Sequence, residues 1–167
     1  MKKKKLVTYA LYVAIILIGI IADQVTKLFA LKYLEPIDTH PIWEGVLHFT
    51  YVENPGAAFG MLANQRWIFI TLSTIAICAL TAYLFLFEVP SRLYTCAICL
   101  VVSGGIGNMI DRTILGYVID FIDFRLINFA VFNVADSFVC VGAGLLILAL
   151  ILDIIKEAKA NKRTSEK

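Results

Sequence analysis

The stretch from Ser103 to Ser137 concentrates polar side chains between long apolar runs. It contains four aspartates, two arginines and three asparagines, namely Asp111, Asp120, Asp123, Asp136, Arg112, Arg125, Asn108, Asn128 and Asn133. Ionisable groups at the edge of a bilayer are costly when unpaired, so they mark function by default. Two carboxylates placed close together cannot both ionise cheaply, which leaves one protonated and one able to deprotonate a water molecule. The stretch therefore predicts hydrolysis of a peptide bond by an aspartate pair.

The residues alone leave the identity of that pair open. Asp136 follows Asn133 by three positions, so it could instead complete a helix N-terminus that Asn133 caps. Asp120 has apolar neighbours, and burial among them would raise its pKa. It could also be a turn carboxylate beside Asp123. Composition does not choose among the acids.

Spacing indicates two ion pairs. Asp111 and Arg112 are adjacent at the end of an apolar run and form, in the simplest interpretation, an internal ion pair. Asp23 and Lys27 are four residues apart, so they share one face of a helix and can pair. That second pair is either an interfacial salt bridge or a polar wall of the active site.

The amino-acid composition is too apolar for a protein that is surrounded by water alone. The chain of 167 residues is 60% hydrophobic and 17% charged, its mean hydropathy is +0.82, and a soluble domain carries about 25% charged residues. This predicts a single domain, residues 1–167, in a lipid bilayer. The net charge of +2 is too small to indicate a nucleic-acid partner.

Cysteine and histidine do not indicate a metal site. All four cysteines lie in apolar runs, and the Cys96-x-x-Cys99 pair has no second pair, so we expect small buried hydrophobic side chains. His40 and His48 lack carboxylate or cysteine partners at ligand spacing and are expected at the membrane interface. We predict no metal and no cofactor.

Four apolar runs are each long enough to cross a bilayer. They lie at about 6–27, 67–87, 93–111 and 134–153. Between the first two, Pro36 and Pro41 prevent a helix, and the alternation in Val46–Val52 predicts a strand. The expected fold is a mainly α membrane protein, a four-helix transmembrane bundle with a small β-sheet region at about 36–62 on the outer face. Residues 156–167 are expected to form a frayed, solvated cytoplasmic tail.

The basic residues predict the orientation of the bundle. If both termini and the 88–92 loop share one side, that side holds ten of the 15 Lys and Arg residues. The other side holds the remaining five, Lys27, Lys32, Arg66, Arg112 and Arg125. The positive-inside rule then places both termini in the cytoplasm and gathers the acids at the outer face.

Five segments of the sequence resemble the lipoprotein signal peptidase (signal peptidase II) family, the integral-membrane aspartic enzymes of bacteria. They are Asp23-Gln24-x-Thr26-Lys27, Asn54-x-Gly56-Ala57-Ala58-Phe59, Gly107-Asn108-x-x-Asp111-Arg112, Val118-x-Asp120-Phe121 and Phe132-Asn133-x-Ala135-Asp136. They occur in the family's order and span the chain to about Asp153. The chain departs from the pattern at Ala130, where many members have proline.

The resemblance implies that Asp120 and Asp136 form a catalytic dyad. The implied substrate groove is lined by Asn54, Gly56, Asn108, Arg112 and Asn133. The implied supporting residues are Asp23, Lys27, Asp111 and Ala135. The implied substrate is a prolipoprotein whose lipobox cysteine carries a diacylglyceryl group, cut just before that cysteine.

The expected partners are that prolipoprotein and membrane lipid, in the cytoplasmic membrane of a bacterium, and a monomer is the simplest expectation. A small transporter or proton-relay protein could use the same acids. Against this alternative, the acids gather at one face instead of forming a chain across the bilayer, and no internal repeat is evident.

Overall fold

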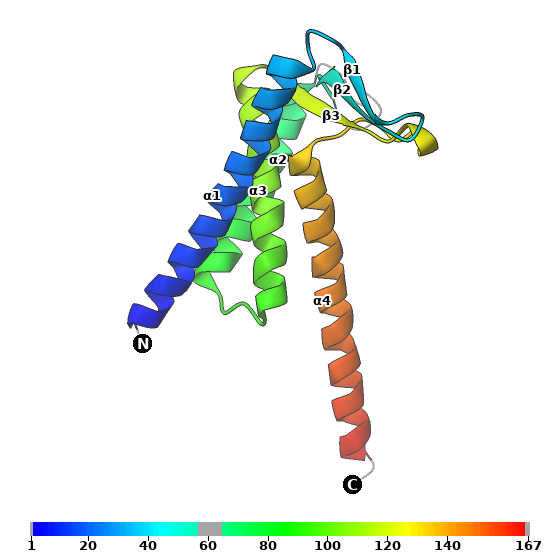
Figure 1. Ribbon diagram of the computed structural model, residues 1–167. Helices are drawn as coiled ribbons and strands as arrows, with labels where there is room; N and C mark the ends of the chain where they lie inside the picture. Colours follow the sequence, from blue (N-terminus) through cyan, green and yellow to red (C-terminus); the bar gives the residue numbers. More distant parts are fainter. Residues whose placement is uncertain (1, 57–64, 166–167) are drawn as a thin grey trace.

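The computed structural model describes residues 2–56 and 65–165 (Figure 1). In chain order the elements are α1 (Lys2–Tyr33), β1 (Thr39–Trp43), β2 (Leu47–Asn54), α2 (Arg66–Leu86), α3 (Arg92–Ile114), β3 (Val118–Asp123), the 3-10 helix η2 (Arg125–Ile127) and α4 (Val134–Ser165). Within the described residues, four helices are long and apolar enough to cross a membrane. Together with the small sheet, they confirm the predicted fold class.

Helix α3 lies at the centre of the bundle and packs against α1, α2 and α4. Half of its apolar stretch is buried, against 6% of that of α2. The sheet lies at one end of the bundle and both termini lie towards the other (Figure 1). The residues at the sheet end of the helices therefore share one depth with the sheet.

Two helices extend beyond the apolar runs. Helix α1 continues to Tyr33 and ends before Pro36, because proline cannot continue a helix. Helix α4 continues through Ser165, so the prediction of a frayed tail from residue 156 is wrong for 156–165. The alanines, lysines and glutamate of that segment are good helix formers, which explains the extension.

Small residues let the central helices approach closely. A Cβ atom on Gly107 would lie 2.5 Å from Asp23 Oδ2 and 3.3 Å from Ala135 Cβ, and one on Gly104 would clash with the backbone carbonyl of Ala135. In lipid, such glycines permit backbone contact between helices. Here they bring α1 and α4 against the same turns of α3.

The sheet is antiparallel with the order β1-β2-β3. Strands β1 and β2 lie in the region predicted to be β, and residues 57–62 of that region are outside the described residues. Strand β3 was not predicted. It is buried on both faces for most of its length, so it lacks the alternation by which half-exposed strands are recognised.

The structure places the two histidines in the sheet and corrects the prediction for the cysteines. His40 in β1 is exposed, whereas His48 in β2 is buried, at 4% exposed, and its Nε2 accepts a hydrogen bond from the Gly45 amide at 3.2 Å; their location at the membrane interface stays a prediction. Of the cysteines, Cys99 is buried but Cys78, Cys96 and Cys140 are exposed. An apolar position in a membrane protein need not be buried, because the outside of the bundle is also apolar.

Candidate active site

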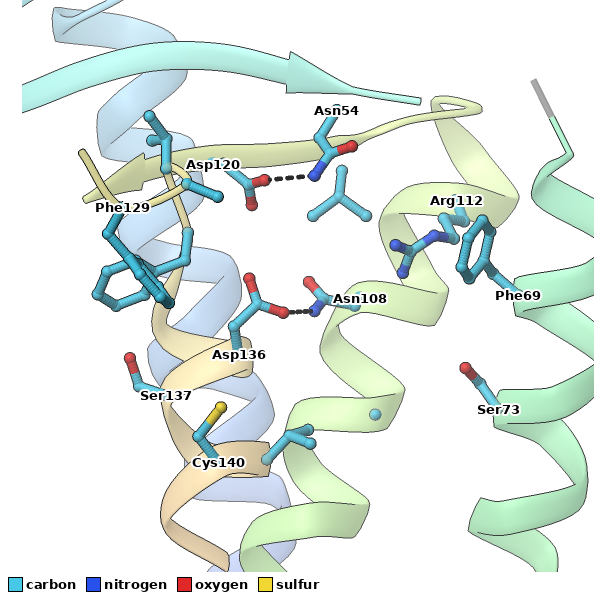
Figure 2. A pocket seen from close by; sticks show the side chains of 16 residues that line it. Asn54, Phe69, Ser73, Asn108, Arg112, Asp120, Phe129, Asp136, Ser137 and Cys140 are labelled. Carbon is cyan, nitrogen blue, oxygen red and sulfur yellow. Dashed lines mark hydrogen bonds between the residues drawn. The ribbon is translucent and has the colours of Figure 1, made fainter. Parts of the chain in front are cut away.

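Asp120 projects from the middle of β3, and a bulge in β2 brings Asn54 beside it. The register between β2 and β3 shifts by one residue between Phe49 and Val52, so that Val52 pairs with Asp120. A one-residue shift exchanges the two faces of a strand. It puts Asn54 on the same face as Asp120, where Asn54 Nδ2 donates to Asp120 Oδ2 at 2.9 Å (Figure 2).

Asp136 lies in the first turn of α4, which Asn133 precedes. The backbone N–H of Asp136 donates to Asn133 Oδ1 at 2.9 Å, and the backbone N–H of Asn133 donates to Asp136 Oδ2 at 3.2 Å. These reciprocal bonds form a capping box, with aspartate in the place of the usual glutamate. The capping interpretation of Asp136 is therefore correct. It does not exclude a chemical role, because Asp136 also lines the cavity described below.

Two asparagine side chains connect the two carboxylates. Asn108 Nδ2 donates to Asp136 Oδ1 at 2.7 Å. Asn133 Nδ2 donates to Asp120 Oδ1 at 2.6 Å and to Asn108 Oδ1 at 3.0 Å. Both Asp120 and Asn133 are almost completely buried, at 1% and 0% exposed. The acids from β3 and α4 thus belong to one hydrogen-bonded unit.

A buried ionic cluster lies behind this unit. Lys27 Nζ is 2.9 Å from Asp23 Oδ2 and 2.8 Å from Asp111 Oδ2. Asp23 Oδ1 accepts from the Ala135 amide at 2.9 Å, and Asp111 Oδ2 accepts from the Ile119 amide at 3.2 Å. The cluster therefore ties α1 and α3 to the first turn of α4 and to β3. The predicted pair of Asp23 with Lys27 is present.

The interpretation of Asp111 and Arg112 as an internal ion pair is wrong. Adjacent residues on a helix do not face each other, and Asp111 turns towards Lys27 instead. Arg112 Nη2 donates to the Gly56 carbonyl at 2.9 Å, and its guanidinium lies 5.0 Å from the centre of the Phe69 ring. Arg112 therefore links α3 to α2 and to the segment after β2.

A cavity of about 540 Å³ lies in front of the acids. Five predicted site residues line it, namely Asn54, Asn108, Arg112, Asp120 and Asp136. Figure 2 shows the two aspartates on one side and Arg112 with Phe69 on the other. The remaining predicted residues do not line the cavity. Gly56, Asn133 and Lys27 are hydrogen-bonded to lining residues, and Asp23, Asp111 and Ala135 are connected to them through Lys27.

Several lining residues escaped the sequence interpretation. Phe69 and Ser73 come from α2, Gly105 from α3, and Val139 and Cys140 from α4. They are small or apolar residues inside membrane spans, so no local signal marks them. Gln24 was also missed as a contact residue, although it lies inside a quoted motif; its Nε2 donates to Asp111 Oδ1 at 2.9 Å and to the Gly107 carbonyl at 3.2 Å.

The surroundings of Asp120 favour its protonated form. Burial raises the pKa of Asp120 to about 7; the hydrogen bond from Asn54 opposes this rise, and the nearby Asp136 adds to it. Asp120 can therefore hold a proton near neutral pH, and it lines the same cavity as Asp136. Among the described residues no group of three or more His, Cys, Asp or Glu is arranged to hold a metal ion.

Comparison with known proteins gives a family match over most of the chain. A family model described as signal peptidase (SPase) II matches residues 15–152. The chain is 46% identical over 131 residues to a lipoprotein signal peptidase of Caldanaerobacter subterraneus subsp. tengcongensis, covering 78% of this chain and 89% of that one. It is 47% identical over 134 residues to one from Clostridioides difficile, covering 79% and 88%.

The fold is also similar to that of a solved protein described as a bacterial membrane enzyme. The two superpose with a TM-score of 0.80 at 32% identity, covering 87% of this chain and 90% of the other. A second structure with the same description gives a TM-score of 0.76, also at 32% identity. The match covers most of the chain and is not confined to one motif.

Proposed function

The chain belongs to the signal peptidase II family of lipoprotein-processing membrane proteases, and from this premise we propose that it is an aspartic endopeptidase in which Asp120 and Asp136 activate water. Its substrate is a prolipoprotein that carries a diacylglyceryl group on its lipobox cysteine. Cleavage just before that cysteine releases the signal peptide. The observation that carries the proposal is the convergence of Asp120 from β3 and Asp136 from α4 on one cavity, joined through Asn108 and Asn133.

The chemistry follows from the proton that Asp120 holds. Asp120 keeps that proton, because its burial raises its pKa to about 7, and donates a hydrogen bond to the scissile carbonyl. Asp136 acts as the general base and removes a proton from a water molecule, which attacks the carbonyl carbon. The tetrahedral intermediate collapses when Asp136 passes the proton that it took from water to the nitrogen of the lipidated cysteine. The C–N bond then breaks, and the amine leaves as the new N-terminus.

The other predicted residues have separate roles in this proposal. Asn54 and Asn108 orient the two carboxylates, and the buried Asn133 joins them instead of touching substrate. Arg112 binds the substrate backbone on the opposite wall, and the Gly56 carbonyl holds its guanidinium in place. The apolar residues Val139 and Cys140, which follow Asp136 along α4 and line the cavity, receive the signal-peptide residues that precede the cleaved bond.

The location of the site suits a lipid-anchored substrate. The sheet and the acids lie at the end of the bundle away from the termini, and the positive-inside rule places the termini in the cytoplasm. The active site then lies at the outer surface of the membrane, at the depth where a diacylglyceryl anchor holds its cysteine.

A cleavage assay tests the proposal. Purified protein in detergent with EDTA is given a diacylglyceryl-modified prolipoprotein and, separately, the unmodified form. We expect cleavage of the modified form alone, and a loss of at least about 1,000-fold in kcat for Asp120→Asn and Asp136→Asn. Substantial turnover by either folded variant would refute the dyad. Cleavage that EDTA abolishes would refute a metal-independent reaction.

A further inference from the structure

Lys27 is a buried cation whose three donor positions are all occupied. Its side chain is 2% exposed, and its Nζ contacts Asp23 Oδ2 at 2.9 Å, Asp111 Oδ2 at 2.8 Å and Asn108 Oδ1 at 2.8 Å. An ammonium group has three N–H donors and no acceptor. The two carboxylates are sufficient to compensate its charge. The third N–H donates to the neutral side-chain amide of Asn108, and this contact is not needed to compensate the charge.

The amide of Asn108 could be placed in either of two orientations, because its oxygen and its NH2 group have nearly the same shape. In the structure Asn108 Oδ1 accepts from Lys27 Nζ at 2.8 Å and from Asn133 Nδ2 at 3.0 Å. Asn108 Nδ2 donates to Asp136 Oδ1 at 2.7 Å. Rotating the amide by half a turn would put its NH2 against an ammonium group and its oxygen against a carboxylate.

We propose that Lys27 is a positioning residue, whose ammonium fixes the side-chain orientation of Asn108 so that an N–H, and not a carbonyl oxygen, faces Asp136. Asp23 and Asp111 hold the ammonium at the point where it meets Asn108 Oδ1. Lys27 does not line the cavity, and its direct hydrogen-bonded path to the Asp136 carboxylate runs through the Asn108 side chain. A longer path runs through Asp23 to the backbone N–H of Ala135. This inference rests on the proposed function, because it assigns a role in orienting the base of that reaction.

The orientation matters for the attack on the substrate. Asn108 Nδ2 donates to one oxygen of Asp136, and the backbone N–H of Asn133 donates to the other at 3.2 Å. Together they fix the plane of the carboxylate relative to a water molecule in the cavity. If Asn108 can rotate, Asp136 loses a donor and gains a repulsive oxygen in part of the population. A misplacement of about 1 Å at a reacting group can lower the rate by about 100-fold.

Three variants separate this contact from the charge of the cluster. The charge-matched pair is the methionine and glutamine double variants, which differ in the N–H donor at residue 27, and Asp111→Asn is the reference that keeps Lys27 and its bond to Asp23. Asp111→Asn keeps Lys27 and its bond to Asn108, whereas the double variant Lys27→Met/Asp111→Asn removes that bond. The double variant also keeps the net charge of the cluster: two carboxylates and one ammonium in the native protein, and the Asp23 carboxylate alone in the variant. A third variant, Lys27→Gln/Asp111→Asn, restores a neutral N–H donor at residue 27.

We expect kcat of the methionine double variant to be about 10- to 100-fold below that of Asp111→Asn, with KM nearly unchanged. The glutamine double variant should recover most of the difference. Equal kcat values for the folded methionine double variant and Asp111→Asn would overturn the proposal. So would a loss confined to KM, because Lys27 would then act on substrate binding.

A measurement on the native protein does not depend on activity or on the folding of any variant. In protein labelled with 15N-asparagine, the Asn108 side-chain NH2 should give a nuclear Overhauser effect to the Asp136 Hβ protons. An effect to the Lys27 Hε protons instead would show the reverse orientation and overturn the inference. If the native protein does not cleave the lipidated substrate but shows the expected effect, the proposed function fails and the amide orientation stands.

Discussion

The two aspartates of β3 lie three residues apart but belong to polar networks that differ in burial. Asp120 belongs to the inner network, with Asn54, Asn133, Asn108 and the cluster around Lys27. Asp123 belongs to the outer network, where it accepts from Arg125 Nε at 2.8 Å and from Thr50 Oγ1 at 2.7 Å. Arg125 also donates to Thr39 and Thr50, so the outer network crosses all three strands.

The ion pairs of the two networks have the same length and different surroundings. Lys27–Asp111 and Arg125–Asp123 are both 2.8 Å. The side chains of the first pair are 2% and 4% exposed, and those of the second 42% and 13%. Breaking a buried pair leaves an uncompensated charge away from water, whereas an exposed pair is replaced by hydration. Burial, and not distance, therefore determines what each pair contributes.

The largest effect in this comparison is expected from crowding the inner network without removing any charge. Gly107→Ala places a Cβ atom 2.5 Å from Asp23 Oδ2, which displaces that carboxylate from Lys27 and from the Ala135 amide. Overpacking of this kind costs about 1–3 kcal/mol of unfolding free energy, and kcat should fall with it. Both are measured in detergent, by denaturant titration and by the cleavage assay.

Gly144→Ala is the matched control for that variant. Gly144 also lies in a membrane helix, but a Cβ atom there meets nothing within 4 Å. This variant should be as stable as the native protein or slightly more so, because alanine is the better helix former. Equal stability and kcat for the two variants would mean that the approach of α1 to α3 relaxes freely, and that the inner network is not tightly packed.

An effect of intermediate size is expected from pH. Burial raises the pKa of Asp120 to about 7. For Asp123, partial burial acts to raise the pKa, but the hydrogen bonds from Arg125 and Thr50 outweigh it and the pKa is lowered. Asp120 therefore favours the folded state at low pH and loses this contribution as the pH rises towards 7. Asp123 contributes stability above its unfolded pKa of about 3.9, and loses it on acidification.

The corresponding prediction concerns the alkaline limb of the rate profile. Because the proposed mechanism requires a protonated Asp120, kcat should fall as the pH rises through about 7. Asp123→Asn, which changes only the outer network, should leave the midpoint of that limb unmoved. A midpoint that moves with Asp123→Asn would show that the two networks titrate together. A kcat profile that is flat to pH 9 would show that the reaction does not require a protonated Asp120.

The sequence predicted those parts of the inner network that are local along the chain. Asp23 and Lys27 are one helical turn apart, and Asn133 and Asp136 are three residues apart, so helix geometry alone brings each pair together. The four spans were also predictable, because each must cross the same thickness of hydrocarbon. The assignment of Asp120 and Asp136 as the dyad came from the resemblance to the family, and it stays a prediction.

The contacts that could not be predicted join distant parts of the chain. The pairing of Asp111 with Lys27 depends on how closely α1 approaches α3, which Gly107 permits. The Asn54–Asp120 bond depends on a single extra residue in β2, which has no sequence signal of its own. The same holds for β3, whose burial on both faces hides its alternation.

The smallest effect is expected in the outer network. Arg125→Ala removes an ion pair whose arginine is 42% exposed, and such pairs contribute about 0–1 kcal/mol. The loss of unfolding free energy should lie in that range and should shrink in 1 M salt, where the Debye length is about 3 Å. The rate of cleavage should stay at the native value, because Asp120 retains its bonds to Asn54 and Asn133. A large loss of kcat in a stable Arg125→Ala protein would instead mean that the outer network holds β3 in position for catalysis, and that burial does not separate the two networks.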